Sequence, residues 1–157
     1  MPKRYTPFSL FMRQALMYPP AQKNYPADQQ FIDNGDGTIS DLSTGLMWAK
    51  DGNGPGCNNG GTLDWEDAVD FAEALEFAGY DDWYLPEIKE LETIVDYSAA
   101  NPAIDPTAFP NCQSSYYWSS TTHAHFTDYA WFVYFYDGYV IYDAKTNEYY
   151  VRPVRQY

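Results

Sequence analysis

Three groups of residues in this chain have side chains that could do chemistry: an acid-and-glycine run, a histidine pair and two cysteines. The run from 33 to 41 suggests a calcium loop. An EF-hand reading starting at Asp33 would place Gly35, Gly37 and Thr38 at loop positions 3, 5 and 6, where the motif needs two oxygen-bearing side chains and a glycine. The run is therefore predicted to be a hairpin turn.

The histidine pair is His123 and His125, two residues apart. On a strand this spacing puts both rings on one face, which would make half of a metal site. The sequence offers no third ligand beyond Asp128, so both are predicted to be exposed loop histidines. No metal or other cofactor is expected.

The two cysteines, Cys57 and Cys112, both lie in Gly/Asn/Pro-rich stretches. A single pair is compatible with a loop disulfide or with two free thiols, and both alternatives stay open. Cys112 and His123 suggest a nucleophile and its base, but no orienting or oxyanion element is recognisable. The chain is therefore predicted not to be an enzyme.

The charge distribution excludes several classes of partner. The formal charge is −13, and every acid lies at or after Asp28, where 22 acids face only Lys50, Lys89, Lys145, Arg152 and Arg155. Such a body repels phosphate backbones and anionic membranes, so nucleic acid is not an expected partner. No segment approaches the roughly 20 apolar residues of a membrane span, and no secretion signal is legible. The chain is expected to be soluble, with any export by another route.

The elements that must position these residues follow from apolar spacing and turn signals. A length of 157 residues suits one domain, with residues 1–28 as a proline-rich extension, helix-capable over 9–17, and 29–157 as the domain. A hairpin is predicted over 31–50, and helices over 62–79, capped by Thr62 or Asp64, and over 85–97. A loop over 101–111 then leads to strands over 114–122, 130–143 and 149–155, the last confined by Pro153 to an edge or a bulge. The fold class is α+β.

Tyrosines are concentrated in the last third of the chain, which holds ten of the sixteen. In the hairpin that turns at Asp137-Gly138, alternation predicts one inward and one outward set of side chains. The inward set is Trp131, Val133, Phe135, Val140 and Tyr142, and the outward set is Phe132, Tyr134, Tyr136, Tyr139 and Ile141. Two explanations stay open: an exposed recognition surface rimmed by Asp128, Asp137 and Asp143, or a sheet covered on both faces by the extension or another subunit.

The ordered motifs resemble a known family. FIDNGDGTISDLSTGLMWAK, LDWEDAVDFAEAL, AGYDDWYLPEIKELETIVDY, YYWSSTT, AWFVYFYDG and YVRPVR are similar to the Lcl C-terminal domain family of bacterial and viral proteins, from Phe31 to Arg155. The resemblance implies a C-type-lectin-like fold of the formylglycine-generating-enzyme branch, with two helices packed on small antiparallel sheets. It also implies an adhesin or receptor-binding role.

The sequence departs from the family pattern at several positions. The family commonly has Arg at the position of Tyr84 and Cys at the position of Pro153, so one possible partner of Cys112 is missing. The sugar-binding tripeptides of true C-type lectins are absent, so neither calcium nor a defined sugar is carried over. Some relatives bind sulfated polysaccharides through basic surfaces, and the acidic body argues against that ligand.

Some proteins of this fold are variable products of diversity-generating retroelements, in which adenine-directed mutagenesis rewrites asparagine codons. Positions that resemble the family scaffold are Trp131, Val133, Phe135, Gly138, Val140, Lys145, Tyr150, Val151 and Arg152. The predicted ligand-binding residues lie between them, and all are reachable from asparagine codons: His123, His125, Phe126, Asp128, Tyr129, Phe132, Tyr134, Tyr136, Asp137, Tyr139, Ile141, Tyr142, Asp143, Asn147 and Tyr149.

Three hypotheses of function follow. The leading one is a non-catalytic recognition module, diversified by a retroelement, that binds a protein or glycan on a cell or virion surface. The second is a structural domain whose aromatic hairpin is buried in an assembly. The third, an oxidase-like enzyme using Cys57 or Cys112, is implied only by the fold branch.

Overall fold

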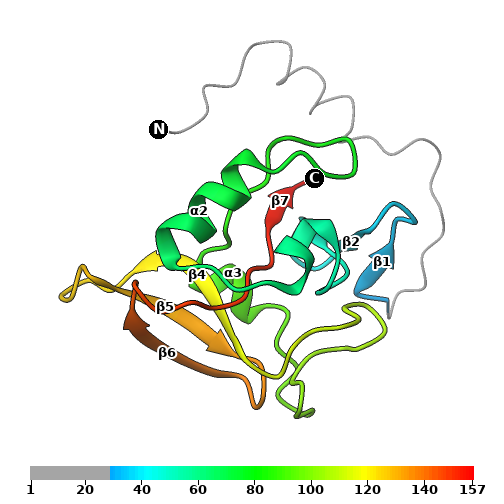
Figure 1. Ribbon diagram of the computed structural model, residues 1–157. Coiled ribbons are helices and arrows are strands. Elements are labelled where there is room, and N and C mark those ends of the chain that lie inside the picture. The colour runs from blue at the N-terminus through cyan, green and yellow to red at the C-terminus, as the bar shows by residue number, and fades with distance from the viewer. Residues whose placement is uncertain (1–28) are drawn as a thin grey trace.

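The structure is a computed structural model that describes residues 29–157 (Figure 1). Four short strands form the first sheet, in the order β1-β2-β3-β7: β1 (Phe31–Asp33), β2 (Thr38–Asp41), β3 (Leu46–Ala49) and β7 (Val154–Gln156). Three longer strands form the second sheet: β4 (Tyr116–Thr122), β5 (Tyr129–Tyr134) and β6 (Tyr139–Ala144). The helices are η1 (Pro55–Gly60), α2 (Trp65–Ala74) and α3 (Ile88–Glu92).

All strand pairs within the two sheets are antiparallel, which confirms the α+β class. The helix expected over 9–17 lies outside the described residues.

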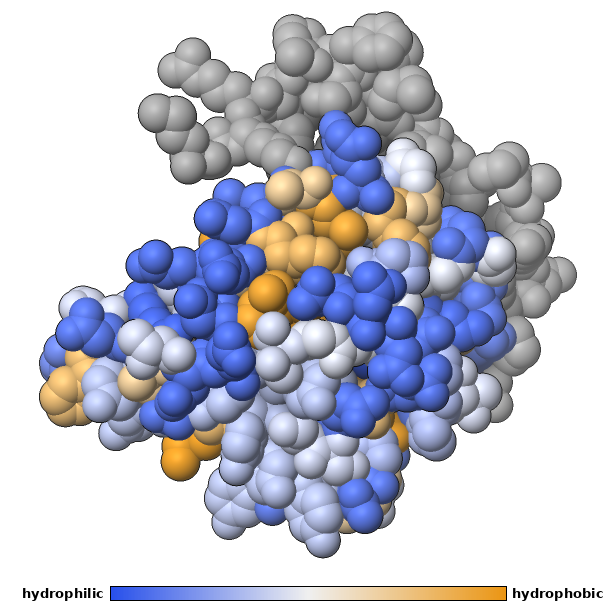
Figure 2. Space-filling view, viewed as in Figure 1, coloured by the Kyte–Doolittle hydropathy of each residue, from blue (hydrophilic) through white to orange (hydrophobic). Residues whose placement is uncertain are grey.

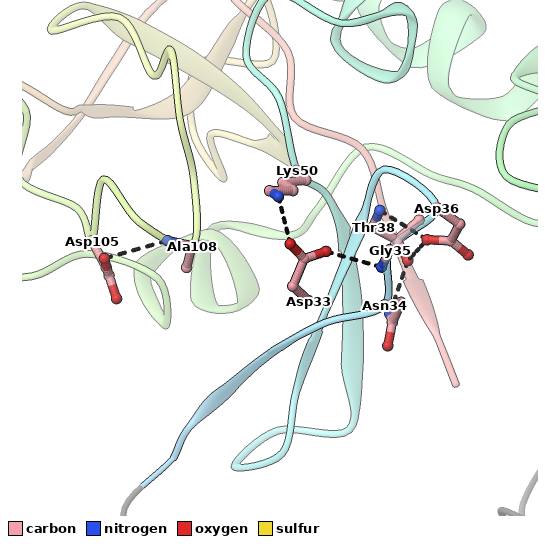
Figure 3. Close-up of polar contacts among 8 residues, drawn as sticks. All are labelled: Asp33, Asn34, Gly35, Asp36, Thr38, Lys50, Asp105 and Ala108. Atoms are coloured by element: carbon pink, nitrogen blue, oxygen red, sulfur yellow. Dashed lines mark hydrogen bonds and ion pairs between the residues drawn. The ribbon is translucent and has the colours of Figure 1, made fainter.

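The acid-and-glycine run is a hairpin turn between β1 and β2, as predicted. Asp33 Oδ1 accepts a hydrogen bond from the amide of Gly35 at 3.0 Å, and Asp36 Oδ1 accepts from the amide and hydroxyl of Thr38 at 3.0 and 2.6 Å (Figure 3). Gly35 and Gly37 have φ of 78° and 92°, a conformation that favours glycine. The carboxylates of this run therefore stabilise the turn.

The first helix begins where the sequence predicted and ends earlier. Asp64 is its N-cap and accepts a hydrogen bond from the amide of Asp67 at 2.9 Å. The exit predicted at Gly79 is wrong. Leu75 is already extended, and the backbones of Phe77 and Tyr80 exchange two hydrogen bonds of 2.9 and 3.0 Å across the turn that contains Gly79.

The second helix, α3, is much shorter than the range 85–97. Glu87 and Glu90 form a reciprocal capping box at its start, so Pro86 precedes the helix. After Glu92 the chain turns away, and the amide of Asp96 bonds to the carbonyl of Ala103 at 2.9 Å. The predicted apolar residues Leu91 and Ile94 are nevertheless buried, so the apolar spacing identified the core side chains correctly.

The closing segment is divided between the two sheets. Tyr149 and Tyr150 make single bridges to Leu63 and Tyr117, and β7 follows Pro153 as an edge strand beside β3. The strand predicted over 149–155 is therefore reduced to Val154–Gln156, and Pro153 lies just before it, with its carbonyl accepting from the amide of Ala49 at 3.2 Å. On the side away from β3, Val154 exchanges two hydrogen bonds of 2.9 Å with Tyr84. All four residues of β3 are buried, and Leu46 and Trp48 belong to the core cluster that packs against the second sheet.

The second sheet is covered on both faces at its centre. Val133 and Phe135 pack with Ile39, Trp48 and other residues of the first sheet and α3. On the opposite face, Phe132 packs in a cluster with Ala68, Ala72, Leu85, Trp118, Ala130 and Val151. The covering side chains come from α2 and from the closing segment of the same chain.

The two predicted sets do lie on opposite faces of the sheet, but the burial predicted for three of their side chains is corrected. Phe132 is only 4% exposed although it belongs to the set predicted to be exposed. Trp131 is half-buried and Tyr142 is 38% exposed, although both were predicted to be core. A strand that is packed on both faces buries neighbouring residues, so its core residues do not alternate.

Both cysteines are free thiols, so of the two alternatives the structure shows no disulfide. Cys57 is buried in η1, and burial raises the pKa of its thiol to about 11. Cys112 is half-buried.

Candidate ligand-binding surface

The hairpin of β5 and β6 presents one broad aromatic face. Its register pairs Tyr134 with Tyr139 and Phe132 with Ile141, so these four side chains lie on the same side of the second sheet. The turn is built as the sequence indicated: Gly138 has φ of 87°, and Asp137 Oδ1 accepts from the amide of Tyr139 at 3.2 Å. A Cβ on Gly138 would lie 2.6 Å from a methyl of Val95, so only glycine fits there.

Close ring contacts hold the base of this face. Tyr116 lies 4.6 Å from Tyr134 and 5.0 Å from both Phe132 and Tyr149, between ring centroids. The Tyr149 hydroxyl donates to Asp143 Oδ2 at 2.6 Å. Burial, and then this bond to the carboxylate, raises the pKa of Tyr149 above its usual range. These side chains form a fixed base on which the outer rings stand.

The outer side chains of this surface are exposed. Tyr139 and Ile141 are 69% and 48% exposed, and Tyr136, 45% exposed, stacks on Tyr134 with centroids 5.7 Å apart. Burial raises the pKa of Tyr134 above its ordinary value, with Tyr116 and Asp137 adding to the shift. We call this surface the hairpin face, and its members are Tyr116, Phe132, Tyr134, Tyr136, Tyr139, Ile141, Asp143 and Tyr149.

Tyr116 is the member that the sequence reasoning missed. The motif YYWSSTT was recognised as a strand, but its residues were not assigned to the site. In the register of β4 and β5, Tyr116 is the direct partner of Tyr134. Pairing the predicted strand with the predicted hairpin, in a register that aligns the two tyrosines, is the signal that could have found it.

A second aromatic cluster lies at the far end of the same sheet, on the opposite face. His123 has ring centroids 4.2 Å from Tyr142, 5.0 Å from Phe126 and 5.5 Å from Trp131. Its Nδ1 accepts hydrogen bonds from the amides of His125 and Phe126, at 3.2 and 3.1 Å. That nitrogen therefore orders the loop. We call the group His123, Phe126, Tyr129, Trp131 and Tyr142 the histidine end.

The predicted site residues divide among three places. The hairpin face gathers Phe132, Tyr134, Tyr136, Tyr139, Ile141, Asp143 and Tyr149. The histidine end gathers His123, Phe126, Tyr129 and Tyr142. Exposed loop positions hold His125, Asp128, Asp137 and Asn147. One flat ligand surface cannot contact both faces of a sheet, so the structure separates what the sequence grouped together.

The basic side chains of residues 29–157 are all engaged within the domain. Lys50 pairs with Asp33 at 2.6 Å. Lys89 pairs with Glu92 at 3.2 Å, and Arg155 with Asp82 at 2.6 Å. Lys145 Nζ donates to Thr122 at 2.9 Å and lies 3.8 Å from the centre of the Trp65 ring. Arg152 is buried and donates to the carbonyls of Ala49 and Lys50 at 2.7 and 2.9 Å. The surface therefore offers carboxylates and aromatic rings, and hydrophilic residues predominate on the face shown in Figure 2.

Within residues 29–157, no group of three or more His, Cys, Asp or Glu side chains could hold a metal ion. None of the helices in this range is long and apolar enough to cross a membrane.

Comparison with known proteins agrees with the motif-based resemblance. A family model described as the Lcl C-terminal domain matches residues 37–155. No curated protein matched the chain. Because the match spans both sheets and the three described helices except for β1, the chain belongs to the Lcl C-terminal domain family.

Proposed function

We propose that this protein is a non-catalytic recognition module of C-type-lectin-like fold. Its hairpin face contacts a protein or glycan on the surface of a cell or virion. The observation that carries the proposal is the arrangement of exposed rings, Tyr136 and Tyr139, on the fixed base that Tyr116 and Tyr149 help to form. Tyrosine gives a large contact area at low entropic cost, which suits a recognition surface.

Exposure and rigidity together favour recognition over a purely structural role for these rings. Exposed apolar groups that gather on one surface of a soluble protein mark contact sites. The rings that hold the base, Phe132 and Trp118, are buried and tie the hairpin to α2. A partner would therefore meet a preformed surface and lose little conformational entropy of the protein on binding.

The proposal includes diversification by a retroelement. Of the scaffold positions, Val133, Phe135, Gly138, Val151 and Arg152 are buried, whereas most of the positions reachable from asparagine codons are exposed or half-buried. Such a division lets side chains at the surface vary while the core keeps the fold stable. Phe132 is the exception, because it is reachable and buried.

The test of recognition compares two double variants on opposite faces of the sheet. The wild-type chain is screened on arrays of glycans and of cell-surface proteins, and each ligand found is then tested on the variants. Tyr136→Ser/Tyr139→Ser should abolish binding, and Phe126→Ser/Tyr129→Ser at the histidine end should retain it. Undiminished binding by the first variant would exclude the hairpin face as the contact surface.

The test of diversification uses the neighbouring DNA. A near-identical template repeat, with asparagine codons at the reachable positions and a reverse transcriptase gene beside it, is expected. A locus without such a repeat would remove this part of the proposal and leave recognition untouched.

A second candidate function is assembly through the same hairpin. It is favoured by the position of β6, which is an edge strand of the second sheet and carries the exposed Tyr139 and Ile141. Light scattering separates the two functions. A monomer leaves the hairpin face available for a ligand, whereas a dimer that Tyr139→Ser disrupts identifies the face as an oligomer interface.

A further inference from the structure

A groove lies beside the β1 edge of the first sheet, far in sequence from the hairpin face. β1 is the edge strand of the first sheet, and a cavity of about 590 Å³ lies next to it. Phe31 and Asp33 of β1 and Ile39 of β2 line one side, and residues 93–96 with Asp105, Thr107 and Ala108 line the other. Figure 3 shows Asp33 and Asp105, which come from these two sides.

The backbone of β1 leaves bonding groups for a further strand. The carbonyl of Gln30 accepts from the amide of Leu42 at 2.9 Å, and the amide of Asn34 donates to the carbonyl of Thr38 at 3.1 Å. Since successive residues of a strand point their bonding groups to opposite sides, Phe31 and Asp33 turn theirs away from β2. The Phe31 carbonyl accepts from the side-chain amide of the exposed Gln29 at 3.1 Å, and no strand of residues 29–157 pairs with this side.

The side chains of the groove combine an apolar floor with an acidic rim. Phe31 and Val95, both half-buried, supply the accessible apolar surface, since Ile39 and Ile94 are only 1% and 2% exposed. The rim carries Asp33, Asp96 and Asp105. Hydrogen bonds from Ser98 hold the pKa of Asp96 below its usual value, so this carboxylate stays charged.

Only one of the three rim carboxylates is paired with a cation of the domain. Lys50 Nζ lies 2.6 Å from Asp33 Oδ2. The other four bases of residues 29–157 are engaged elsewhere, by Glu92, Thr122, Asp82 and two backbone carbonyls. Asp96 and Asp105 therefore offer negative charge to a partner.

We propose that the groove receives an extended segment of a partner protein, which adds as a strand to β1 and carries a lysine or arginine. Backbone bonds to Phe31 and Asp33 would hold the segment, as in other cases where a peptide extends a sheet edge. The alternation of a strand then directs every second side chain over the groove. A lysine or arginine there lays its aliphatic stem on Phe31 and Val95 and brings its charge to Asp96 and Asp105.

The experiment uses the full chain and a short probe peptide. The capped pentapeptide TVKVT is titrated into isotopically labelled protein and followed by NMR, beside TVEVT and a TVKVT peptide methylated on its backbone nitrogens. TVKVT should shift the amide signals of Phe31 and Asp33 and bind at least about fivefold more tightly than TVEVT. The methylated peptide should not bind, since it cannot pair with a strand.

A matched pair of variants locates the charge effect. Asp96→Asn/Asp105→Asn keeps side-chain acceptors for the local turns and should weaken TVKVT binding by about fivefold or more. Glu66→Gln/Asp70→Asn removes the same charge from the exposed face of α2 and should leave the affinity unchanged.

Four results would overturn the proposal. Two are the absence of shifts at Phe31 and Asp33, and equal affinity for TVKVT and TVEVT. The third is self-association of the wild-type chain that Asp96→Asn/Asp105→Asn abolishes, which would make a second copy the occupant. The fourth is faster tryptic cleavage after Arg13 and Lys23 in that variant, which would make residues 1–28 the occupant.

Discussion

Arg155 and Asp82 connect β7 to the segment between α2 and α3. Arg155 Nε and Nη2 lie 2.6 and 3.2 Å from the two carboxylate oxygens of Asp82, and the guanidinium carbon lies 3.8 Å from the centre of the Tyr80 ring. The side chains are only 5% and 13% exposed. A bidentate ion pair of this kind holds both side chains in a defined orientation and neutralises their charges inside the domain.

Removing one member of this pair should be costly. Asp82→Ala leaves a buried guanidinium without its carboxylate, and the free energy of unfolding should fall by about 3 kcal/mol or more. Lys89→Ala, which breaks the exposed pair with Glu92, should cost less than about 1 kcal/mol and serves as the control. Denaturant unfolding of both variants measures the difference. Equal, small losses would show that the Arg155–Asp82 pair adds no net stability.

The two thiols should differ sharply in reactivity. Because burial raises the pKa of Cys57 to about 11, about one thiol in a thousand is ionised at pH 8, and the side chain is also inaccessible. Iodoacetamide should therefore modify Cys112 and spare Cys57 in the native chain, with labelling of Cys57 increasing only as the pH approaches 11.

Mass spectrometry of Cys112→Ser checks this expectation. The native variant should take up no label at pH 8, and the denatured variant should take up one. Labelling of Cys57 at the same rate in both states would contradict the buried position of this thiol.

At the scale of elements, the hairpin illustrates what alternation can and cannot predict. The turn at Asp137-Gly138, the exposure of Tyr136 and Tyr139, and the burial of Val133 and Phe135 were all predicted correctly. The burial of Trp131 and Phe132 was predicted the wrong way round, although each lies on its predicted face. The reason is that α2 covers only the central part of one face, and the cover on the other face ends before Trp131. Which part of a strand is covered depends on distant elements, and local periodicity does not contain that information.

The helices show the same limit at their ends. The cap at Asp64 and the burial of Leu91 and Ile94 could be predicted because they depend on residues that are close in sequence. The early end of α2 at Ala74 could not be predicted from the sequence. There the chain leaves the helix and forms a bridge between Phe77 and Tyr80, which replaces the last predicted helical turn. Tyr116 entered the site only through its register with Tyr134, a contact between separate motifs.

The hairpin should separate stability from recognition. Phe132→Ala opens a cavity under α2 and should lower the free energy of unfolding by about 3–5 kcal/mol. Tyr139→Ser removes a ring that is 69% exposed and should change stability by no more than about 0.5 kcal/mol. Thermal and denaturant unfolding measure both. A large loss in Tyr139→Ser would mean that this ring is buried against another copy of the chain.

At the scale of the whole molecule, the unbalanced charge opposes folding. The chain carries a formal charge of −13, and the five bases of residues 29–157 are already engaged. Compaction brings the remaining carboxylates together, and their mutual repulsion destabilises the folded state. Long-range repulsion of this kind is screened by salt, whereas contact pairs such as Arg155 with Asp82 are screened much less.

Stability at pH 7 should therefore rise with sodium chloride. The screening length falls from about 30 Å at 0.01 M salt to about 3 Å at 1 M, so the repulsion fades while the short pairs persist. The melting temperature should increase by about 2–4 °C for each kcal/mol of repulsion removed. The variant Glu66→Gln/Asp70→Asn/Glu73→Gln, which neutralises three exposed acids of α2, should start from a higher melting temperature and gain less from salt. Calorimetry of both proteins across the salt series decides the point: a wild-type melting temperature that falls with salt would mean that ion pairs outweigh repulsion in this acidic domain.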